Sequence, residues 1–154
     1  MARAKYQVLV IPFVRQKSDV LYCVFRRRDM ADVWQFIAGG GEDEDAAPLA
    51  AALREASEEA GIREPRQLVA LESVCSIPTE CFPKARAVWG EACLVIPEYA
   101  FAAELWDTTG IKLSAEHTEY RWVNYQDAVD MLRYDSNKTA LWELDNKLRL
   151  ALIP

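Results

Sequence analysis

Three glutamates are spaced so that their carboxylates would share one side of a helix. Glu55, Glu58 and Glu59 stand at positions i, i+3 and i+4, and residues at these spacings are neighbours on a helix surface. Like charges so placed destabilise a helix by about 0.2–0.5 kcal/mol per pair. A hard divalent cation that prefers oxygen ligands, most simply Mg²⁺, would turn this repulsion into attraction. The cluster alone also fits a solvated helix face on which Arg54 relieves the charge of Glu58.

A glycine-rich acidic segment leads directly into this cluster. Residues 39–45 read Gly-Gly-Gly-Glu-Asp-Glu-Asp, and glycines let a backbone or a ligand approach closely. The run that follows is rich in Ala, Leu, Glu and Arg, which favour a helix. Pro48 fits a first helical turn, and Gly61 stands where a left-handed residue would end the helix. The apolar stripe of this predicted helix consists of Leu49, Leu53, Ala56 and Ala60.

The glycine-rich segment and the helix together resemble the signature of the Nudix hydrolase family. The second half of that signature runs Arg-Glu-apolar-any-Glu-Glu-any-Gly-apolar, and residues 54–62 match it position by position. The first half departs, because its leading glutamate falls on Ala46 when counted back from Arg54 and on Asp45 when counted forward from Gly39. In the family this glutamate supports the loop against the signature's arginine. The departure therefore concerns loop geometry, and the sequence leaves open whether Asp45 replaces the glutamate.

The resemblance implies an enzyme that hydrolyses a phosphoanhydride with the help of Mg²⁺ or Mn²⁺. In the family a glutamate from a later loop often completes the metal shell. Glu116 takes that place because it lies six residues before Trp122, and Glu119 is its rival. The implied catalytic residues are Glu55, Glu59 and Arg54, with Glu55 or Glu59 ahead of Glu116 as the base and Arg54 bracing the loop, and the implied metal ligands are Glu55, Glu58, Glu59 and Glu116.

Two further segments are similar to one Nudix branch, the dihydroneopterin triphosphate and dATP pyrophosphohydrolases. They are the Trp-Val-Asn-Tyr-Gln segment at 122–126 and residues 135–144. The similarity implies that a nucleoside or pterin triphosphate is split into a monophosphate and pyrophosphate. Phe36 and Trp142 are aromatic candidates for base stacking or for the core. The candidate substrate-binding residues are Gly40, Arg27, Arg28, Trp34, Asn137 and Lys138.

Other functions remain open at this stage. A related hydrolase could cleave dinucleoside polyphosphates or nucleotide sugars. A Nudix-like domain could also sense a nucleotide without cleaving it, and the departure in the first half of the signature keeps that alternative open. A third class is an acidic structural domain that binds no metal.

Length and composition indicate a single domain over residues 1–154, and the resemblance implies that it is a Nudix domain. The net charge of −6 is a poor match for duplex DNA or an anionic membrane surface. No Cys-x-x-Cys pair occurs among the four cysteines, which argues against structural zinc. With no secretory or membrane-spanning run, we expect reduced thiols and a cytoplasmic protein. The expected partner is a small polyphosphate, and the sequence leaves monomer and homodimer open.

The elements expected around the cluster give an α/β fold. A mixed sheet would lie between helices in an α/β/α arrangement, as the Nudix fold implies. Asn124 would cap one helix with Asp127, and Ser136 would cap the last, whose inner stripe is Leu141, Leu144, Leu148 and Ala151. Residues 99–110 read as a loop or a short helical piece. The predicted strands cover residues 6–14 and 20–25, which form a hairpin, and residues 34–38, 67–77, 86–96 and 120–123.

Overall fold

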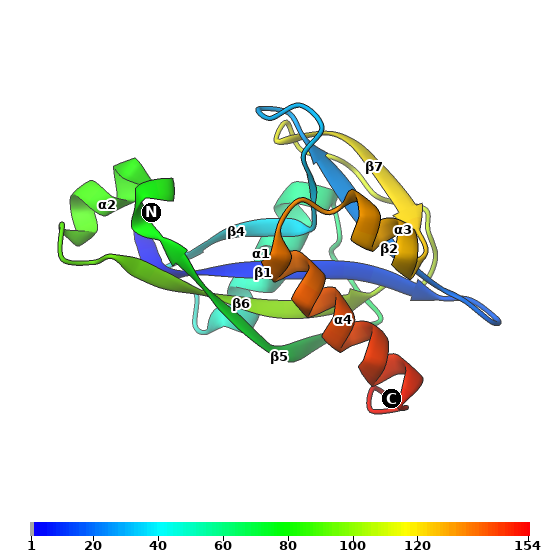
Figure 1. Ribbon diagram of the computed structural model, residues 1–154. Coiled ribbons are helices and arrows are strands. Elements are labelled where there is room, and N and C mark those ends of the chain that lie inside the picture. The colour runs from blue at the N-terminus through cyan, green and yellow to red at the C-terminus, as the bar shows by residue number, and fades with distance from the viewer. Residues whose placement is uncertain (1) are drawn as a thin grey trace.

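The computed structural model describes residues 2–154 (Figure 1). Its strands are β1 (Arg3–Arg15), β2 (Val20–Arg27), β3 (Trp34–Gln35), β4 (Ile37–Glu42), β5 (Gln67–Pro78), β6 (Val95–Glu104) and β7 (His117–Val123). Its helices are α1 (Pro48–Ala60), the 3₁₀ turn η1 (Thr79–Cys81), α2 (Pro83–Trp89), α3 (Tyr125–Met131) and α4 (Asp135–Arg149). Within the described residues, no helix is both long enough and apolar enough to cross a membrane.

The seven strands form one mixed sheet built around β1. The strand order is β3-β2-β1-β6-β5, with β4 also paired to β1 and β7 to β2. Among the strand pairs of residues 2–154, β1 and β6 run parallel and the other pairs are antiparallel. One edge of β1 is shared, because its residues 3–10 pair with β4 and its residues 13–15 with β2. The sheet therefore forks, and the glycine-rich strand β4 lies beside β1.

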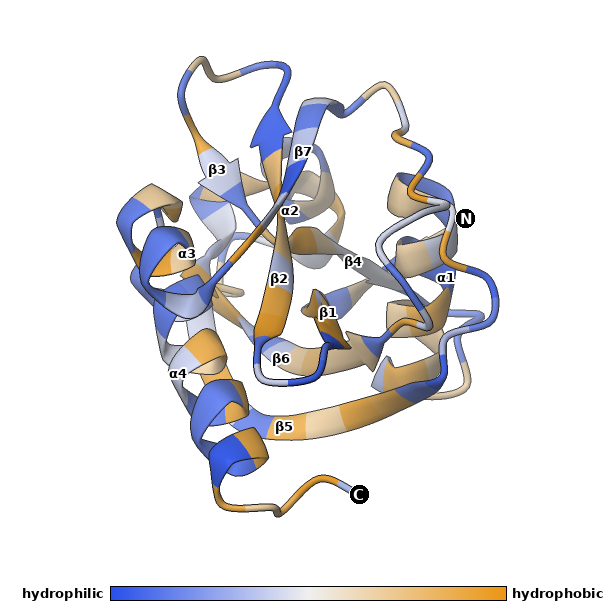
Figure 2. Ribbon diagram, turned by 90° about the vertical axis from the view of Figure 1, so that its right-hand side faces the viewer, coloured by the Kyte–Doolittle hydropathy of each residue, from blue (hydrophilic) through white to orange (hydrophobic). Residues whose placement is uncertain are grey.

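Helices cover both faces of this sheet, which confirms the predicted α/β/α arrangement. Figure 2 shows α1 on one side of the strands and α3 with α4 on the other. Alternate residues of β1 supply the two cores. Val8 and Val10 pack towards α1, whereas Leu9 and Ile11 pack towards α4. The helix α2 and the adjoining ends of β5 and β6 project to one side (Figure 1).

The helix α1 begins and ends as predicted but buries a different face. Pro48 opens it and Gly61 ends it in the left-handed conformation, with φ of 70°. The predicted stripe was wrong in part, because Leu49 and Leu53 are 43% and 41% exposed. The face against the sheet consists of small residues and one acid, namely Ala51, Ala52, Ala56, Glu59 and Ala60. Alanines let the helix approach the sheet closely, and this brings Glu59 into the interior.

Two predictions between residues 83 and 110 were wrong. The predicted strand 86–96 is replaced over its first part by α2, which begins at Pro83 and leaves Val88 82% exposed. The segment 99–110, read as a loop or helical piece, contains the second half of β6, from Tyr99 to Glu104. Its alanines have little intrinsic preference for strands. They are buried because β6 is a central strand, parallel to β1 and antiparallel to β5.

The C-terminal helices confirm one predicted cap and correct another. The side chain of Asn124 accepts a hydrogen bond from the backbone N–H of Asp127 at the start of α3. The last helix begins two residues earlier than expected, with Tyr134 at its N-cap and Ser136 inside its first turn. Its inner stripe includes Leu141 and Leu144, which are fully buried. Ala151, predicted in that stripe, lies beyond the helix and is exposed.

Candidate functional site

The buried face of α1 carries a carboxyl group with no hydrogen-bond donor. Glu59 is 2% exposed, and neither of its oxygens receives a donor from the described residues. Burial raises the pKa of Glu59 strongly, and the neighbouring carboxyl groups of Glu55 and Glu116 raise it further. A buried carboxylate without a partner costs several kcal/mol, roughly, so the group either holds a proton or requires a cation.

Glu55 lies one turn earlier on α1, against the backbone of β4. A Cβ atom built on Gly39 would overlap the carboxyl group of Glu55, so only glycine allows this approach. The side chain of Glu55 is 12% exposed. Burial raises its pKa, and the hydrogen bond from Arg54 opposes that shift. Glu55 and Glu59 therefore form a pair of acids at the junction between the glycine-rich strand and the helix.

Arg54 joins the acidic loop to this pair. Its guanidinium donates to the carbonyl oxygen of Gly40 at 2.9 Å and to Oδ2 of Asp45 at 3.0 Å. It also donates to Oε1 of Glu55 at 2.9 Å and to Oε2 of Glu58 at 3.2 Å. Arg54 thus braces the loop, and the carboxylate it binds there is Asp45, which resolves the open point in the signature.

Replacing Asp45 with asparagine should lower the free energy of unfolding at pH 7 by about 1–2 kcal/mol, because Arg54 loses a charged acceptor. Arg54 holds the pKa of Asp45 below its ordinary value of 3.8. The stabilisation is therefore fully present above pH 3.8, the ordinary pKa of an aspartate in the unfolded chain. It is lost as the pH falls through the lowered pKa of the folded state. Urea unfolding of the wild type and the variant at pH 7 and pH 3 measures this.

The matched control for Asp45 is Asp43, an exposed acid two residues away in the same loop. Asp43→Asn should change the free energy of unfolding by less than about 0.5 kcal/mol. Equal losses in both variants would mean that loop charge in general, rather than the bond to Arg54, supplies the stabilisation.

Glu116 reaches the cluster from a turn held by Arg28. Nε of Arg28 donates to the carbonyl oxygen of Ala115 at 2.6 Å. The backbone N–H of Arg28 donates to the carbonyl oxygen of Glu116 at 3.0 Å. Arg28, predicted to bind substrate, thus fastens the turn that carries a candidate metal ligand. Glu119, the rival ligand, pairs instead with Arg121 at 2.7 Å.

Two of the other predicted substrate-binding residues have structural partners. Arg27 forms an ion pair with Asp29 at 2.6 Å and donates to the hydroxyl of Tyr134 at 3.3 Å. Asn137 is 4% exposed, and its Oδ1 accepts the backbone N–H of Phe36 at 2.9 Å. That bond holds α4 to the break between β3 and β4, and the role of Asn137 in substrate binding stays a prediction.

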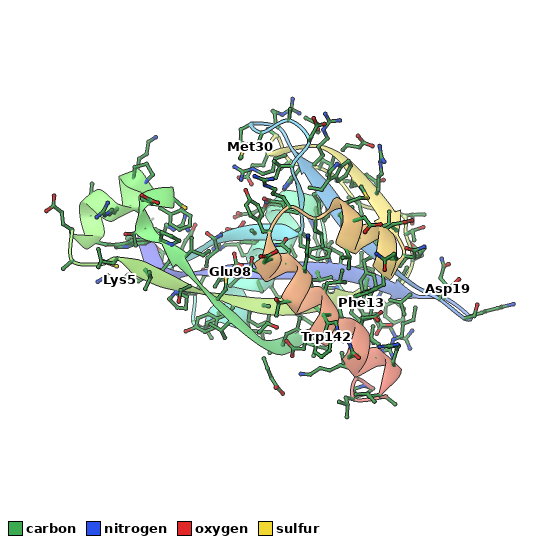
Figure 3. The ribbon with its side chains drawn as sticks, in the orientation of Figure 1. Lys5, Phe13, Asp19, Met30, Glu98 and Trp142 are labelled. Carbon is green, nitrogen blue, oxygen red and sulfur yellow. The ribbon has the colours of Figure 1, made fainter. Side chains whose placement is uncertain are left out.

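The aromatic candidates and Lys138 divide between core and surface. Phe36 is fully buried in the core. Trp34 is half-buried, and the guanidinium of Arg121 stacks on its ring at 5.0 Å. Trp142 is 60% exposed, on α4 (Figure 3). Lys138 is half-buried on α4, and no hydrogen bond or ion pair of its ammonium group is found within residues 2–154.

The carboxylate oxygens of the acidic cluster are the kind of ligand that a divalent cation such as Mg²⁺ prefers. In the described part of the chain, no three His, Cys, Asp or Glu side chains stand close enough together to hold a metal ion as they are. Arg54 binds Glu58 and one oxygen of Glu55 in this arrangement. The carboxyl group of Glu59 is buried without a hydrogen-bond donor and lies beside two further acids. A bound divalent cation would supply the missing partner.

A cavity of about 220 Å³ opens on the other face of the sheet, beside α4. One of its walls contains a buried acid, Glu98, which sequence reasoning missed. The available signal was a lone charge inside the apolar run 94–103. A second cavity, of about 240 Å³ at the C-terminal end of α1, contains none of the predicted site residues. The first cavity is lined by Leu9, Ser73, Val74, Cys75, Glu98, Ala100, Asp135, Ser136 and Thr139.

Comparisons with known proteins place these features in a family. A family model described as NUDIX domain matches residues 4–142. The dihydroneopterin triphosphate diphosphatase of Haemophilus influenzae is 30% identical over 135 residues, which are 87% of this chain and 83% of that protein. A Listeria monocytogenes protein described as a NUDIX hydrolase is 40% identical, with a TM-score of 0.82 and coverage of 96% and 97% of the two chains.

The Escherichia coli dihydroneopterin triphosphate pyrophosphohydrolase superposes with a TM-score of 0.72 at 23% identity, covering 92% of this chain and 94% of that one. At that identity the likeness concerns the fold alone.

Proposed function

This chain belongs to the Nudix family, and on that premise we propose that it is a pyrophosphohydrolase that uses Mg²⁺ or Mn²⁺ to split a nucleoside or pterin triphosphate into a monophosphate and pyrophosphate. One observation carries the proposal. Glu59 is buried without a donor, beside Glu116 and beside Glu55, which itself lies against Gly39 of the glycine-rich strand. A carboxyl group buried in this way lowers the free energy of unfolding unless it binds a cation or a proton.

The acids of the cluster would have different roles in this reaction. Glu55, Glu59 and Glu116 would hold the metal, with Glu58 joining once it leaves Arg54. When bound, the metal would neutralise phosphoryl oxygens and lower the pKa of a coordinated water. Glu55 is our choice for the base, because the bond from Arg54 to its Oε1 favours the ionised carboxylate that accepts a proton.

The surroundings of the acidic cluster support a polyphosphate with a heterocycle at one end. The backbone of Gly39 and Gly40 gives close access to the acids, and the guanidinium of Arg3 lies over Gly40. Arg3 is held there by stacking on the rings of Phe82 and Trp89, at 4.2 and 5.9 Å. A positive group beside a metal site suits an anionic substrate, and the cavity beside α4 offers space for its base.

Product analysis tests the proposal. The purified protein is incubated with dATP, dGTP, dihydroneopterin triphosphate, a dinucleoside polyphosphate and a nucleotide sugar, each with Mg²⁺, with Mn²⁺ and with EDTA. We expect pyrophosphate and a monophosphate from the triphosphates, and no products with EDTA. Release of inorganic phosphate alone, or cleavage confined to the dinucleoside polyphosphate or the sugar, would contradict the proposed reaction. Ligand-induced thermal stabilisation without any turnover would favour a nucleotide sensor.

A further inference from the structure

A row of polar side chains crosses the sheet on the side of α4. Nη2 of Arg3 donates to Oε1 of Gln7 at 2.7 Å. Nε2 of Gln7 then donates to Oε2 of Glu98 at 3.1 Å, and Sγ of Cys75 donates to Oε1 of Glu98 at 3.5 Å. The row links β1, β6 and β5, and it ends on an acid that is 5% exposed. None of these bonds involves the acidic cluster on α1.

The direction of each bond in this row is determined. An arginine only donates, so the amide oxygen of Gln7 must face Arg3 and its NH₂ group must face Glu98. Burial, followed by Glu98 itself, raises the pKa of Cys75 to about 11, so its thiol keeps its proton and also donates. Both oxygens of Glu98 therefore act as acceptors, and these two bonds oppose the rise in the pKa of Glu98 that its burial causes. A carboxylate has about four acceptor positions, so two remain after these bonds.

The position of Glu98 suits the far end of a bound nucleotide. Glu98, which is labelled in Figure 3, lines the cavity of about 220 Å³ together with apolar Leu9 and Ala100. Asp135 from the first turn of α4 lines the same cavity. Gln7 pairs with Gly40 on one side and with Glu98 on the other. Glu98 thus lies two strand spacings, roughly 10 Å, from the glycine-rich strand beside the acidic cluster.

We propose that Glu98 determines the specificity of this site by accepting two adjacent N–H groups of a 2-amino-4-oxopyrimidine ring, the edge that guanine and pterins share. This inference rests on the proposed function, since it concerns the base of the same substrate. The ring N–H and the exocyclic amino group of that edge match two acceptors on one carboxylate. Adenine presents an amino donor next to a ring-nitrogen acceptor, which would face a carboxylate oxygen without a proton between them.

The first test compares substrates of the wild-type protein. dGTP and dITP differ only in the 2-amino group, so they isolate one of the two expected bonds. We expect kcat/KM for dGTP to exceed that for dITP by about tenfold or more, because a bond to a buried charged acceptor is lost. dATP should fall at or below dITP. Equal kcat/KM for dGTP and dITP would overturn the inference without any variant.

The second test changes the residue. Glu98→Gln keeps the shape but replaces one acceptor with a donor, so the ratio of kcat/KM for dGTP over dITP should fall to within about twofold of unity. The matched control is Glu104→Gln on the same strand and face, because Glu104 is equally buried but pairs with Arg15 outside the cavity. That variant should lose stability and keep the wild-type ratio. An unchanged ratio in folded Glu98→Gln would also overturn the inference.

A binding measurement separates this inference from the proposed function. Titration calorimetry of dGMP and dIMP needs no turnover, and the wild type should bind dGMP about tenfold more tightly, with the difference lost in Glu98→Gln. Pyrophosphate release with no preference for dGMP would leave the proposed reaction standing and remove the role of Glu98. A preference for dGMP without hydrolysis of any triphosphate would support the role of Glu98 and contradict the proposed reaction.

Discussion

Glu59→Gln should reduce kcat for the preferred triphosphate by about 10³-fold or more while leaving the protein folded. The loss corresponds to about 4 kcal/mol of transition-state stabilisation, which is the scale of a displaced metal ligand. The same change should not destabilise the metal-free protein, because a neutral amide replaces an acid that is buried without a donor. Steady-state kinetics and thermal unfolding in EDTA measure the two effects.

The pH dependence of unfolding sharpens this prediction. The folded-state pKa of Glu59 is raised above its ordinary value of 4.5 by burial and by its acidic neighbours. Above pH 4.5 the folded protein therefore holds a proton that the unfolded chain has released, so wild-type stability falls as the pH rises towards the raised pKa. Glu59→Gln lacks this loss, and its advantage in Tm should widen from pH 6 to pH 9.

The control for Glu59 is Glu44→Gln, which removes an exposed acid from the loop before α1 and should leave both kcat and Tm near wild type. Retention of more than a tenth of the activity in Glu59→Gln would contradict the role of this acid. A lower Tm in Glu59→Gln than in the wild type, in EDTA at pH 9, would show that Glu59 has a stabilising partner.

Arg54→Ala should lower the free energy of unfolding by about 2–3 kcal/mol and reduce activity by about 10–100-fold. The guanidinium is the shared donor of Asp45, Glu55 and Glu58, so its removal leaves three carboxylates close together and frees the loop from the carbonyl of Gly40. For a chain of this length the expected drop in Tm is about 5–10 °C.

Arg54→Lys distinguishes charge from geometry. A lysine restores one positive charge but cannot donate in a fork to several acceptors. We expect it to recover part of the stability and little of the activity. Arg63→Ala, an exposed arginine just beyond the end of α1, is the matched control and should change Tm by less than about 2 °C. Full activity in Arg54→Lys would mean that the loop needs only a counter-charge.

The parts of the site that depend on local sequence could be predicted. The ends of α1 follow from Pro48 and Gly61, and the spacing of the glutamates identifies the acidic cluster because helical neighbours are set by the chain itself. The side of the helix that would be buried could not be read in the same way. Leu49 and Leu53 are the larger apolar residues, yet the sheet selects the alanine face and with it Glu59.

The cavity beside α4 could not be predicted because it depends on contacts between distant strands. Glu98 meets Gln7 through the parallel pairing of β1 with β6, across 91 positions of sequence. The boundaries of the strand that carries Glu98 were predicted wrongly. The alternation in residues 86–96 is typical of a strand, whereas the alanines that follow Tyr99 are not typical of one. The role of Arg28 was missed for a similar reason, because its acceptor at Ala115 lies 87 positions away.

The most direct test of the central claim is a titration of Mn²⁺ into the metal-free protein, followed by calorimetry, with the wild type and Glu59→Gln measured side by side. The account predicts saturable binding to the wild type that weakens by at least about tenfold in the variant, although both proteins remain folded. Equal Mn²⁺ binding by the two proteins, or no saturable binding by the wild type, would contradict the claim that the acids of α1 serve to hold a divalent cation.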